Sequence, residues 1–318
     1  MGSLTVQLTG ALILFFRFLP AEGWLCAAKW GIFHAVSAFC NAGFDIFGYI
    51  APGQSVAMFN DDPVVLITLM ALIVIGGLGF FVWEEVVTLR HFKKFSVYTK
   101  LVLLFTGSLI LGGAAVILLL EWNNPNTFGP MPLWQKVLNS FFQSVTLRTA
   151  GFASVDQALL TDTTKGFSIL LMFVGGSSGS TAGGMKTVTV LVLMLFVIAR
   201  ARGRSRVSAF HRNIPGDKVL DAMTIVFIML GMSVAGALVI CTTSPVSLVD
   251  AMYETASALA TVGLTAGVTP VLGVGAQLMI IMFMYFGRVG VLTISLGFLM
   301  GNRAEERFRY ADTNLLIG

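Results

Sequence analysis

Three short segments of small residues share one pattern, in which a glycine stands two residues after an Asn or a Thr. The segments are CNAGF, RTAGF and ATVGL, at residues 40–44, 148–152 and 260–264. Glycine adopts positive φ readily, so its peptide carbonyl can turn toward a common axis. A cation that gives up its water shell needs oxygen ligands, and rings of backbone carbonyls supply them in ion-selective pores. The segments therefore predict carbonyl-lined cation sites.

All fifteen residues of these segments are candidate ion-binding residues. They are Cys40, Asn41, Ala42, Gly43, Phe44, Arg148, Thr149, Ala150, Gly151, Phe152, Ala260, Thr261, Val262, Gly263 and Leu264. The three glycines recur at a period of about 110 residues, which indicates an internal repeat. Close helix packing would explain one isolated glycine, but three at one period favour walls around a shared pore.

Each segment follows an apolar run that is too short to cross a bilayer. These runs are Trp30–Cys40, Leu133–Leu147 and Ser247–Ala260. Runs of this length are typical of buried or re-entrant half-helices. The C-terminal end of such a half-helix carries partial negative charge, which favours a cation at that point.

The composition places these segments in a membrane protein. Charged residues make up 11% and hydrophobic residues 56% of the 318-residue chain, too few charges to cover a soluble protein of this size. We expect an all-α polytopic membrane protein in which each repeat runs membrane helix, re-entrant helix, glycine loop, membrane helix. The repeats are expected at 1–95, 96–205 and 206–318. The longer apolar stretches are Leu4–Leu19, Pro63–Trp83, Leu101–Trp122, Phe167–Ala199, Val219–Cys241 and Leu278–Leu299.

The basic residues predict the topology. Most Lys and Arg residues lie in loops 90–100 and 200–218 and in the C-terminal tail, which the positive-inside rule assigns to the cytoplasm. The half-helices then enter from the outside of an inner (plasma) membrane. Positive-inside topology explains these clusters, and because no nucleic-acid motif accompanies them, nucleic acid is not an expected partner.

The stretch Phe167–Ala199 is interrupted by GGSSGSTAGGMKT at residues 175–187. A phosphate-binding loop would need Lys at the position of Met185, so a nucleotide site is rejected. Such a segment can unwind where it lines a water-filled cavity. Arg288 lies within the last apolar stretch, where a charge is costly and usually functional.

Four motifs together resemble the Trk/Ktr potassium-uptake family over essentially the whole chain. They are HAVSAFCNAGFD (34–45), FFQSVTLRTAGFASVD (141–156), GGSSGSTAGGMKT (175–187) and ETASALATVGLTAG (254–267). FGRVGVLT (286–293) and the terminal LLIG favour the Ktr-type membrane subunit. The resemblance implies repeats around a pseudo-fourfold pore axis, with potassium as the ion transported and sodium as a second candidate ion. It implies no organic cofactor in this chain.

The resemblance also implies that the interrupting segment is an intramembrane gate below the filter. The candidate gate residues are Gly175, Gly176, Ser177, Ser178, Gly179, Ser180, Thr181, Ala182, Gly183, Gly184, Lys186 and Arg288. Arg288 is expected to face the cavity and to pair with backbone carbonyls of 175–184. Implied partners are a second copy of the chain, a cytosolic nucleotide-binding regulatory subunit and membrane lipid.

Two further expectations concern charge and repeat number. A cation lining the filter would repel the ion, so Arg148 is expected to point behind its strand, with Glu254 as its hypothetical partner. The family has four repeats and this chain shows three, of which the first resembles the family's second. We therefore expect a fragment lacking the first repeat.

An ion-coupled secondary transporter, a sodium- or proton-coupled cation symporter with discontinuous helices, stays open as the alternative. It predicts inverted repeats and a carboxylate at mid-membrane. An enzyme is not expected, because no nucleophile–base pair or set of metal ligands stands within the apolar stretches.

Overall fold

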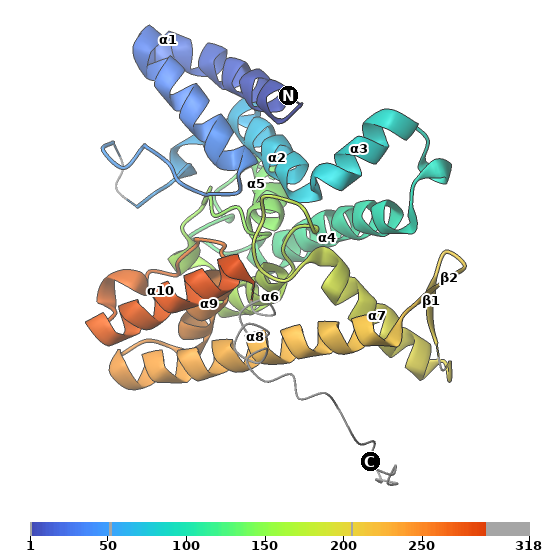
Figure 1. The fold of residues 1–318 in the computed structure, drawn as a ribbon. Coiled ribbons are helices and arrows are strands. Elements are labelled where there is room, and N and C mark those ends of the chain that lie inside the picture. The colour runs from blue at the N-terminus through green and yellow to red at the C-terminus, as the bar shows by residue number, and fades with distance from the viewer. Residues whose placement is uncertain (1, 51–52, 205, 291–318) are drawn as a thin grey trace.

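The computed structural model describes residues 2–50, 53–204 and 206–290, and this part of the chain is mostly helical (Figure 1). In chain order the elements are α1 (Gly2–Phe39), η1 (Ala57–Phe59), α2 (Pro63–Leu78), α3 (Phe80–Leu89), η2 (Phe92–Lys94), α4 (Val97–Glu121), α5 (Leu133–Thr146), η3 (Gln157–Leu159), α6 (Asp162–Phe173), α7 (Thr187–Ala201), β1 (Val207–Ala209), β2 (Arg212–Ile214), α8 (Gly216–Thr243), α9 (Leu248–Leu259), η4 (Thr269–Val271) and α10 (Val274–Val289).

Several of these helices can cross a membrane. In the described part of the chain, α1, α4 and α8 are long and apolar enough, and the bent pair α2–α3 is a fourth candidate. Backbone groups in a bilayer must be hydrogen-bonded within their own segment, and helices satisfy this requirement. The polytopic all-α class expected from the composition is therefore confirmed.

The element α1 contains both of the separate runs that the sequence suggested, the first helix at 4–19 and, apart from its last residue, the first half-helix at 30–40. The helix α1 is broken at Gly23, whose backbone angles are φ 75° and ψ 171°. The two parts of α1 fold back on each other (Figure 1), and a Cβ on Gly31 would lie 2.7 Å from the carbonyl oxygen of Ala11. A glycine is therefore needed where the two parts cross.

The other two half-helices lie where the sequence predicted them. α5 and α9 begin and end within one residue of the expected runs, and they pack against the preceding long helices α4 and α8. The hydroxyl of Ser247 caps α9 by accepting from the Asp250 N–H (3.1 Å). This cap satisfies one free N–H at the point where the half-helix begins.

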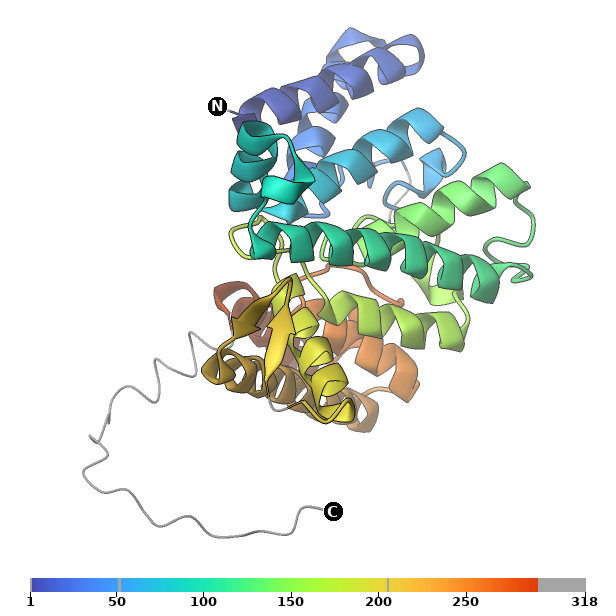
Figure 2. The same ribbon diagram turned by 90° about the vertical axis from the view of Figure 1, so that its right-hand side faces the viewer.

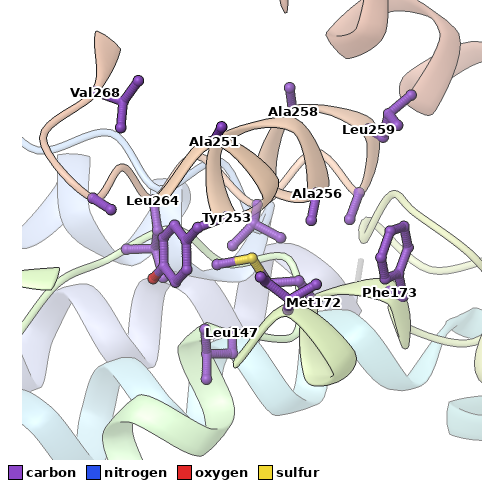
Figure 3. Close-up of a cluster of buried hydrophobic side chains, with 14 of the residues drawn as sticks. Leu147, Met172, Phe173, Ala251, Tyr253, Ala256, Ala258, Leu259, Leu264 and Val268 are labelled. Carbon is purple, nitrogen blue, oxygen red and sulfur yellow. The ribbon is translucent and has the colours of Figure 1, made fainter. Parts of the chain in front are cut away.

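Two hydrophobic cores hold the half-helices in place. One joins α1, α2 and α5, and the other joins α6, α8, α9 and α10. Figure 3 shows the second core, where Tyr253 extends from α9 toward Leu147 and Met172. The half-helices are thus buried between repeats and are not exposed to lipid on all sides.

Two of the predicted spans are interrupted. The run 63–83 bends by 97° at Gly79, between α2 and α3. The run 167–199 divides into α6 and α7, separated by residues 174–186, here called the broken-helix loop. The last run, 278–299, forms a helix that ends at Val289. Residues 291–299 and the C-terminal tail, with the motifs predicted there, lie outside the described residues.

The two basic loops lie at the same end of the molecule. The connection from α3 to α4 covers most of residues 90–100, and the antiparallel strands β1 and β2 form a hairpin within residues 200–218. Figures 1 and 2 show both of them at one end of the helices. The hairpin pairs Val207 with Ile214 and was not predicted from the sequence.

Candidate ion pathway

The three glycine segments, residues 40–44, 148–152 and 260–264, form strands that leave the half-helices; they are called the glycine strands below. Positive φ occurs at Asn41 (50°), Gly43 (69°), Thr149 (69°), Gly151 (87°), Thr261 (54°) and Gly263 (90°). When left-handed and right-handed residues alternate along a strand, successive N–H groups point to one side of it and the carbonyl groups point to the opposite side. Left-handed geometry costs a non-glycine residue about 1–2 kcal/mol, so the surrounding structure must hold the strands in this conformation.

The glycine strands meet at their glycines. A Cβ on Gly43 would lie 2.4 Å from the carbonyl oxygen of Ala150, and a Cβ on Gly151 would lie 2.3 Å from the carbonyl oxygen of Val262. A Cβ on Gly263 would lie 3.9 Å from the Cα of Gly151. Space and backbone conformation thus both require glycine at the first two positions. The three glycines that recur at a regular period in the sequence therefore lie next to one another in the structure.

The last residue of two of the strands has its carbonyl hydrogen-bonded within the protein. The Ser37 hydroxyl donates to the carbonyl oxygen of Phe44 (2.7 Å), and the Thr146 hydroxyl donates to that of Phe152 (2.6 Å). Both hydroxyls belong to the half-helices. These two carbonyls, which the sequence included among the candidate ligands, are therefore engaged by the protein itself.

A cavity of about 930 Å³, here called the funnel, opens onto the three glycines. Its lining includes Gly43, Gly151 and Gly263 together with the carboxylates of Asp45 and Asp156. Neither Lys nor Arg lines it in the part of the chain that the structure describes. A cleft with charges of one sign concentrates ions of the opposite sign, so the funnel favours cations.

The broken-helix loop crosses from α6 and α7 to the bend between α2 and α3. Its ends are joined by a bridge between Val174 and Met185. The Ser177 N–H donates to the Gly77 carbonyl (2.9 Å), and the Ser177 hydroxyl donates to the Leu78 carbonyl. The loop therefore satisfies carbonyls at the C-terminal end of α2, which would otherwise lack partners.

The same loop contacts all three glycine strands, and none of its residues lines the funnel. The left-handed Asn or Thr of each strand faces one loop residue: Asn41 faces Thr181, Thr149 faces Gly175, and Thr261 faces Gly183. A Cβ on Gly183 would lie only 1.8 Å from the Thr261 hydroxyl oxygen, so this position admits glycine alone. The loop and the strands thus form one packed unit.

Thr181 connects the loop to the end of α1 and to α10. Its hydroxyl accepts from the Asn41 amide nitrogen (2.9 Å) and donates to the carbonyl oxygen of Phe39 (2.9 Å). Its own carbonyl accepts from the Arg288 guanidinium (2.9 Å). Arg288 lies in the last turn of α10, and the rest of its predicted span, 291–299, lies outside the described residues.

The other two basic candidates also bind carbonyls. Lys186 Nζ donates to the Ala182 carbonyl (2.8 Å) within the loop. Arg148 is buried and donates to the Gly175 carbonyl (3.3 Å), and it does not line the funnel. The pairing of Arg148 with Glu254 was wrong, because that carboxylate accepts from the hydroxyls of Thr265 and Thr269 beyond the third glycine.

Sequence reasoning missed two buried polar clusters. Gln143, Gln157 and Tyr253 form one behind the second glycine strand. Glu121 forms the other, where its carboxylate accepts four hydrogen bonds between α4 and α6. Two signals in the sequence could have indicated these clusters: Gln143 lies in the middle of a half-helix, and Glu121 lies at the end of a membrane helix.

Comparison with known proteins agrees with the fold. The family model TrkH, described as a cation transport protein, matches residues 4–307. The potassium/sodium uptake protein NtpJ of Enterococcus hirae is 36% identical over 99% of this chain and 70% of its own length. The Ktr system potassium uptake protein B of Bacillus subtilis is 36% identical over 99% of this chain and 69% of its length.

The chain therefore belongs to the TrkH family of cation transport proteins, and it is a transport protein rather than an enzyme. Among solved structures, the potassium transporter TrkH of Vibrio parahaemolyticus superimposes with a TM-score of 0.71 at 19% identity. The match covers 92% of this chain and 61% of that chain, so the chain spans less than two thirds of this structural neighbour.

Proposed function

We propose that the chain lines a channel-like pathway for potassium, in which the glycine strands act as the selectivity filter. The observation that carries the proposal is the convergence of Gly43, Gly151 and Gly263 on one funnel that contains the carboxylates of Asp45 and Asp156. Relatives named as potassium uptake proteins support the choice of ion. Backbone carbonyls at this convergence would replace the water lost by the ion.

Three buried side-chain oxygens support a path through the strands. Among the described residues, Asn41 Oδ1, Thr149 Oγ1 and Thr261 Oγ1 have no hydrogen-bond partner. A buried polar oxygen without a partner is costly, and a passing cation or water would satisfy it. One such oxygen occurs at the same position of each strand.

The test is uptake of radioactive rubidium, a potassium analogue, by liposomes that contain the purified full protein. We expect saturable uptake that excess potassium inhibits more strongly than excess sodium. Empty liposomes and a Gly43→Val variant are the controls, because a valine side chain would enter the space of the neighbouring strand. Equal uptake in all three preparations would refute the proposal.

We further propose that the broken-helix loop is the gate of this pathway. Its contacts with Asn41, Thr149 and Thr261 would place it across the inner end of the strands. The basic segments 90–100 and 200–218 would then face the cytoplasm, as would the C-terminal tail. The units 1–95, 96–205 and 206–318 would each supply one wall.

An ion-coupled symporter is the second candidate, supported by the discontinuous pair α6–α7 and by a relative named for potassium and sodium uptake. The two candidates differ in one measurement. An imposed inward sodium gradient would drive rubidium accumulation above the outside concentration by a symporter, whereas a channel would respond only to the electrochemical gradient of rubidium itself. We expect no accumulation when the potential is held at zero.

The proposed partners are a second copy of the chain and a cytosolic nucleotide-binding regulatory subunit. The basic end formed by the α3–α4 connection and the β1–β2 hairpin is the proposed surface for that subunit (Figure 2). Light scattering of the detergent-solubilised protein would give the copy number. A mass equal to one chain plus detergent would refute the homodimer.

A further inference from the structure

Three buried polar side chains form a closed hydrogen-bond network behind the second glycine strand. Gln143 Nε2 donates to Gln157 Oε1 (2.5 Å), and Gln157 Nε2 donates in return to Gln143 Oε1 (3.3 Å). The Tyr253 hydroxyl also donates to Gln157 Oε1 (2.9 Å), while Gln157 Nε2 reaches the Val155 carbonyl (2.7 Å). All three side chains are buried.

The network encloses the second strand on both sides. Gln143 lies on α5, before the strand, and Gln157 begins η3, after the strand, so their amide pair closes the chain around residues 148–152. Gln157 also lines the funnel. A change in this pair would therefore be transmitted to Gly151 from both ends of its strand.

Tyr253 connects this unit to the next repeat. It lies on α9, the half-helix that leads into the third strand, and its aromatic ring is enclosed by the second core (Figure 3). The strands that it links are in direct contact, since a Cβ on Gly151 would meet the carbonyl oxygen of Val262. The hydroxyl of Tyr253 thus sets how closely α9 approaches the second strand.

The first and second strands are connected differently. There the Val56 N–H donates to the Ala153 carbonyl (3.1 Å), and the Ala153 N–H donates to the Ser55 hydroxyl (3.2 Å). The first bond joins main-chain atoms, which a substitution does not remove, and the second uses the loop hydroxyl of Ser55 and not a buried side-chain network. At the boundary between the second and third strands, side chains provide the connection, and these can be altered one atom at a time.

We propose that Gln143, Gln157 and Tyr253 are positioning residues that hold the second and third glycine strands at a set separation, and that this separation determines selection of potassium over sodium. The proposal rests on the proposed function. A sodium ion is smaller than a potassium ion, so carbonyls can coordinate it closely only if the strands approach each other. Buried, fully satisfied hydrogen bonds resist that approach.

The first variant is Tyr253→Phe, which removes a single oxygen and preserves the ring. Rubidium and sodium uptake are measured in liposomes that contain the full protein. We expect the rubidium-to-sodium ratio to fall about three- to tenfold, as loss of one hydrogen bond predicts. Rubidium uptake itself should stay close to that of the wild type. Tyr285→Phe is the matched control, because Tyr285 is exposed on α10, and its ratio should not change.

A second variant separates positioning from stability. This triple variant combines Gln143→Met, Gln157→Met and Tyr253→Phe, so that apolar groups of similar size replace the network. Few polar atoms are then left unsatisfied, and the melting temperature should be close to that of the wild type. The ratio should remain low in this variant. A wild-type ratio in the triple variant, or an equal fall in Tyr285→Phe, overturns the inference. Wild-type protein that takes up neither ion overturns the proposed function instead.

Discussion

Replacing Thr181 by valine should open the proposed gate. Valine has nearly the same shape as threonine but cannot accept from the Asn41 amide or donate to the Phe39 carbonyl, the two bonds that the Thr181 hydroxyl makes at 2.9 Å. The hydrogen bond from the Arg288 guanidinium to the Thr181 carbonyl is unchanged by this substitution. The variant therefore tests the side-chain contacts of the loop with the first repeat alone.

The size of the effect follows from the two lost bonds. Each is worth about 0.5–1.5 kcal/mol net, so together they favour the seated loop by about 2 kcal/mol. Since 1.4 kcal/mol corresponds to a factor of ten, the ratio of open to seated loop should rise about 30-fold. The loop should otherwise keep its contacts with α2 through Ser177.

The assay is basal rubidium uptake into liposomes without any regulatory subunit. We expect Thr181→Val to raise the initial rate about tenfold or more, while Thr181→Ser, which keeps the hydroxyl, stays near the wild type. Thr224→Val is the matched control, because its exposed hydroxyl bonds only within α8, to the Leu220 carbonyl. Equal rates for the valine and serine variants at position 181 would refute the reasoning.

Three further substitutions test other parts of the pathway. Gly151→Ala should abolish rubidium uptake, because its Cβ would lie 2.3 Å from the Val262 carbonyl oxygen; uptake above one tenth of wild type would contradict this. Arg288→Ala removes the donor to the Thr181 carbonyl and should raise basal uptake severalfold; unchanged uptake would exclude this role. Glu121→Gln leaves two of the four donors around this buried carboxylate facing an amide NH₂, at a cost of about 2–4 kcal/mol. The melting temperature in detergent should therefore fall by several degrees, and an unchanged value would argue against a stabilising role.

The sequence was most informative where a pattern is repeated. The period of the three glycines predicted strands that the structure brings together, and the apolar runs at 133–147 and 247–260 predicted α5 and α9 closely. Repetition is informative because the same physical requirement, left-handed backbone at two positions of each strand, acts at each copy. One isolated glycine, such as Gly23, gives no such signal: the runs at 4–19 and 30–40 predicted two separate segments, but not the residue at which α1 breaks.

Single polar contacts between repeats could not be predicted. Tyr253 and Gln157 are 96 residues apart, and neither hydrophobic period nor spacing relates them. Arg148 shows the same limit, since a carboxylate was the expected partner and a backbone carbonyl, that of Gly175, accepts its hydrogen bond. Every residue carries such a carbonyl, so composition cannot identify which one a buried cation will choose.

The hydrogen bonds at the end of α2 link the proposed gating to the uptake of water. In the seated state the broken-helix loop supplies hydrogen-bond donors to the carbonyls of Gly77 and Leu78, and the Phe80 N–H donates to the Gly179 carbonyl. When the loop leaves, these groups require water molecules as replacement partners. Opening of the proposed gate would therefore take up water, and osmotic stress from an excluded solute should close the proposed pathway in proportion to the number of waters taken up.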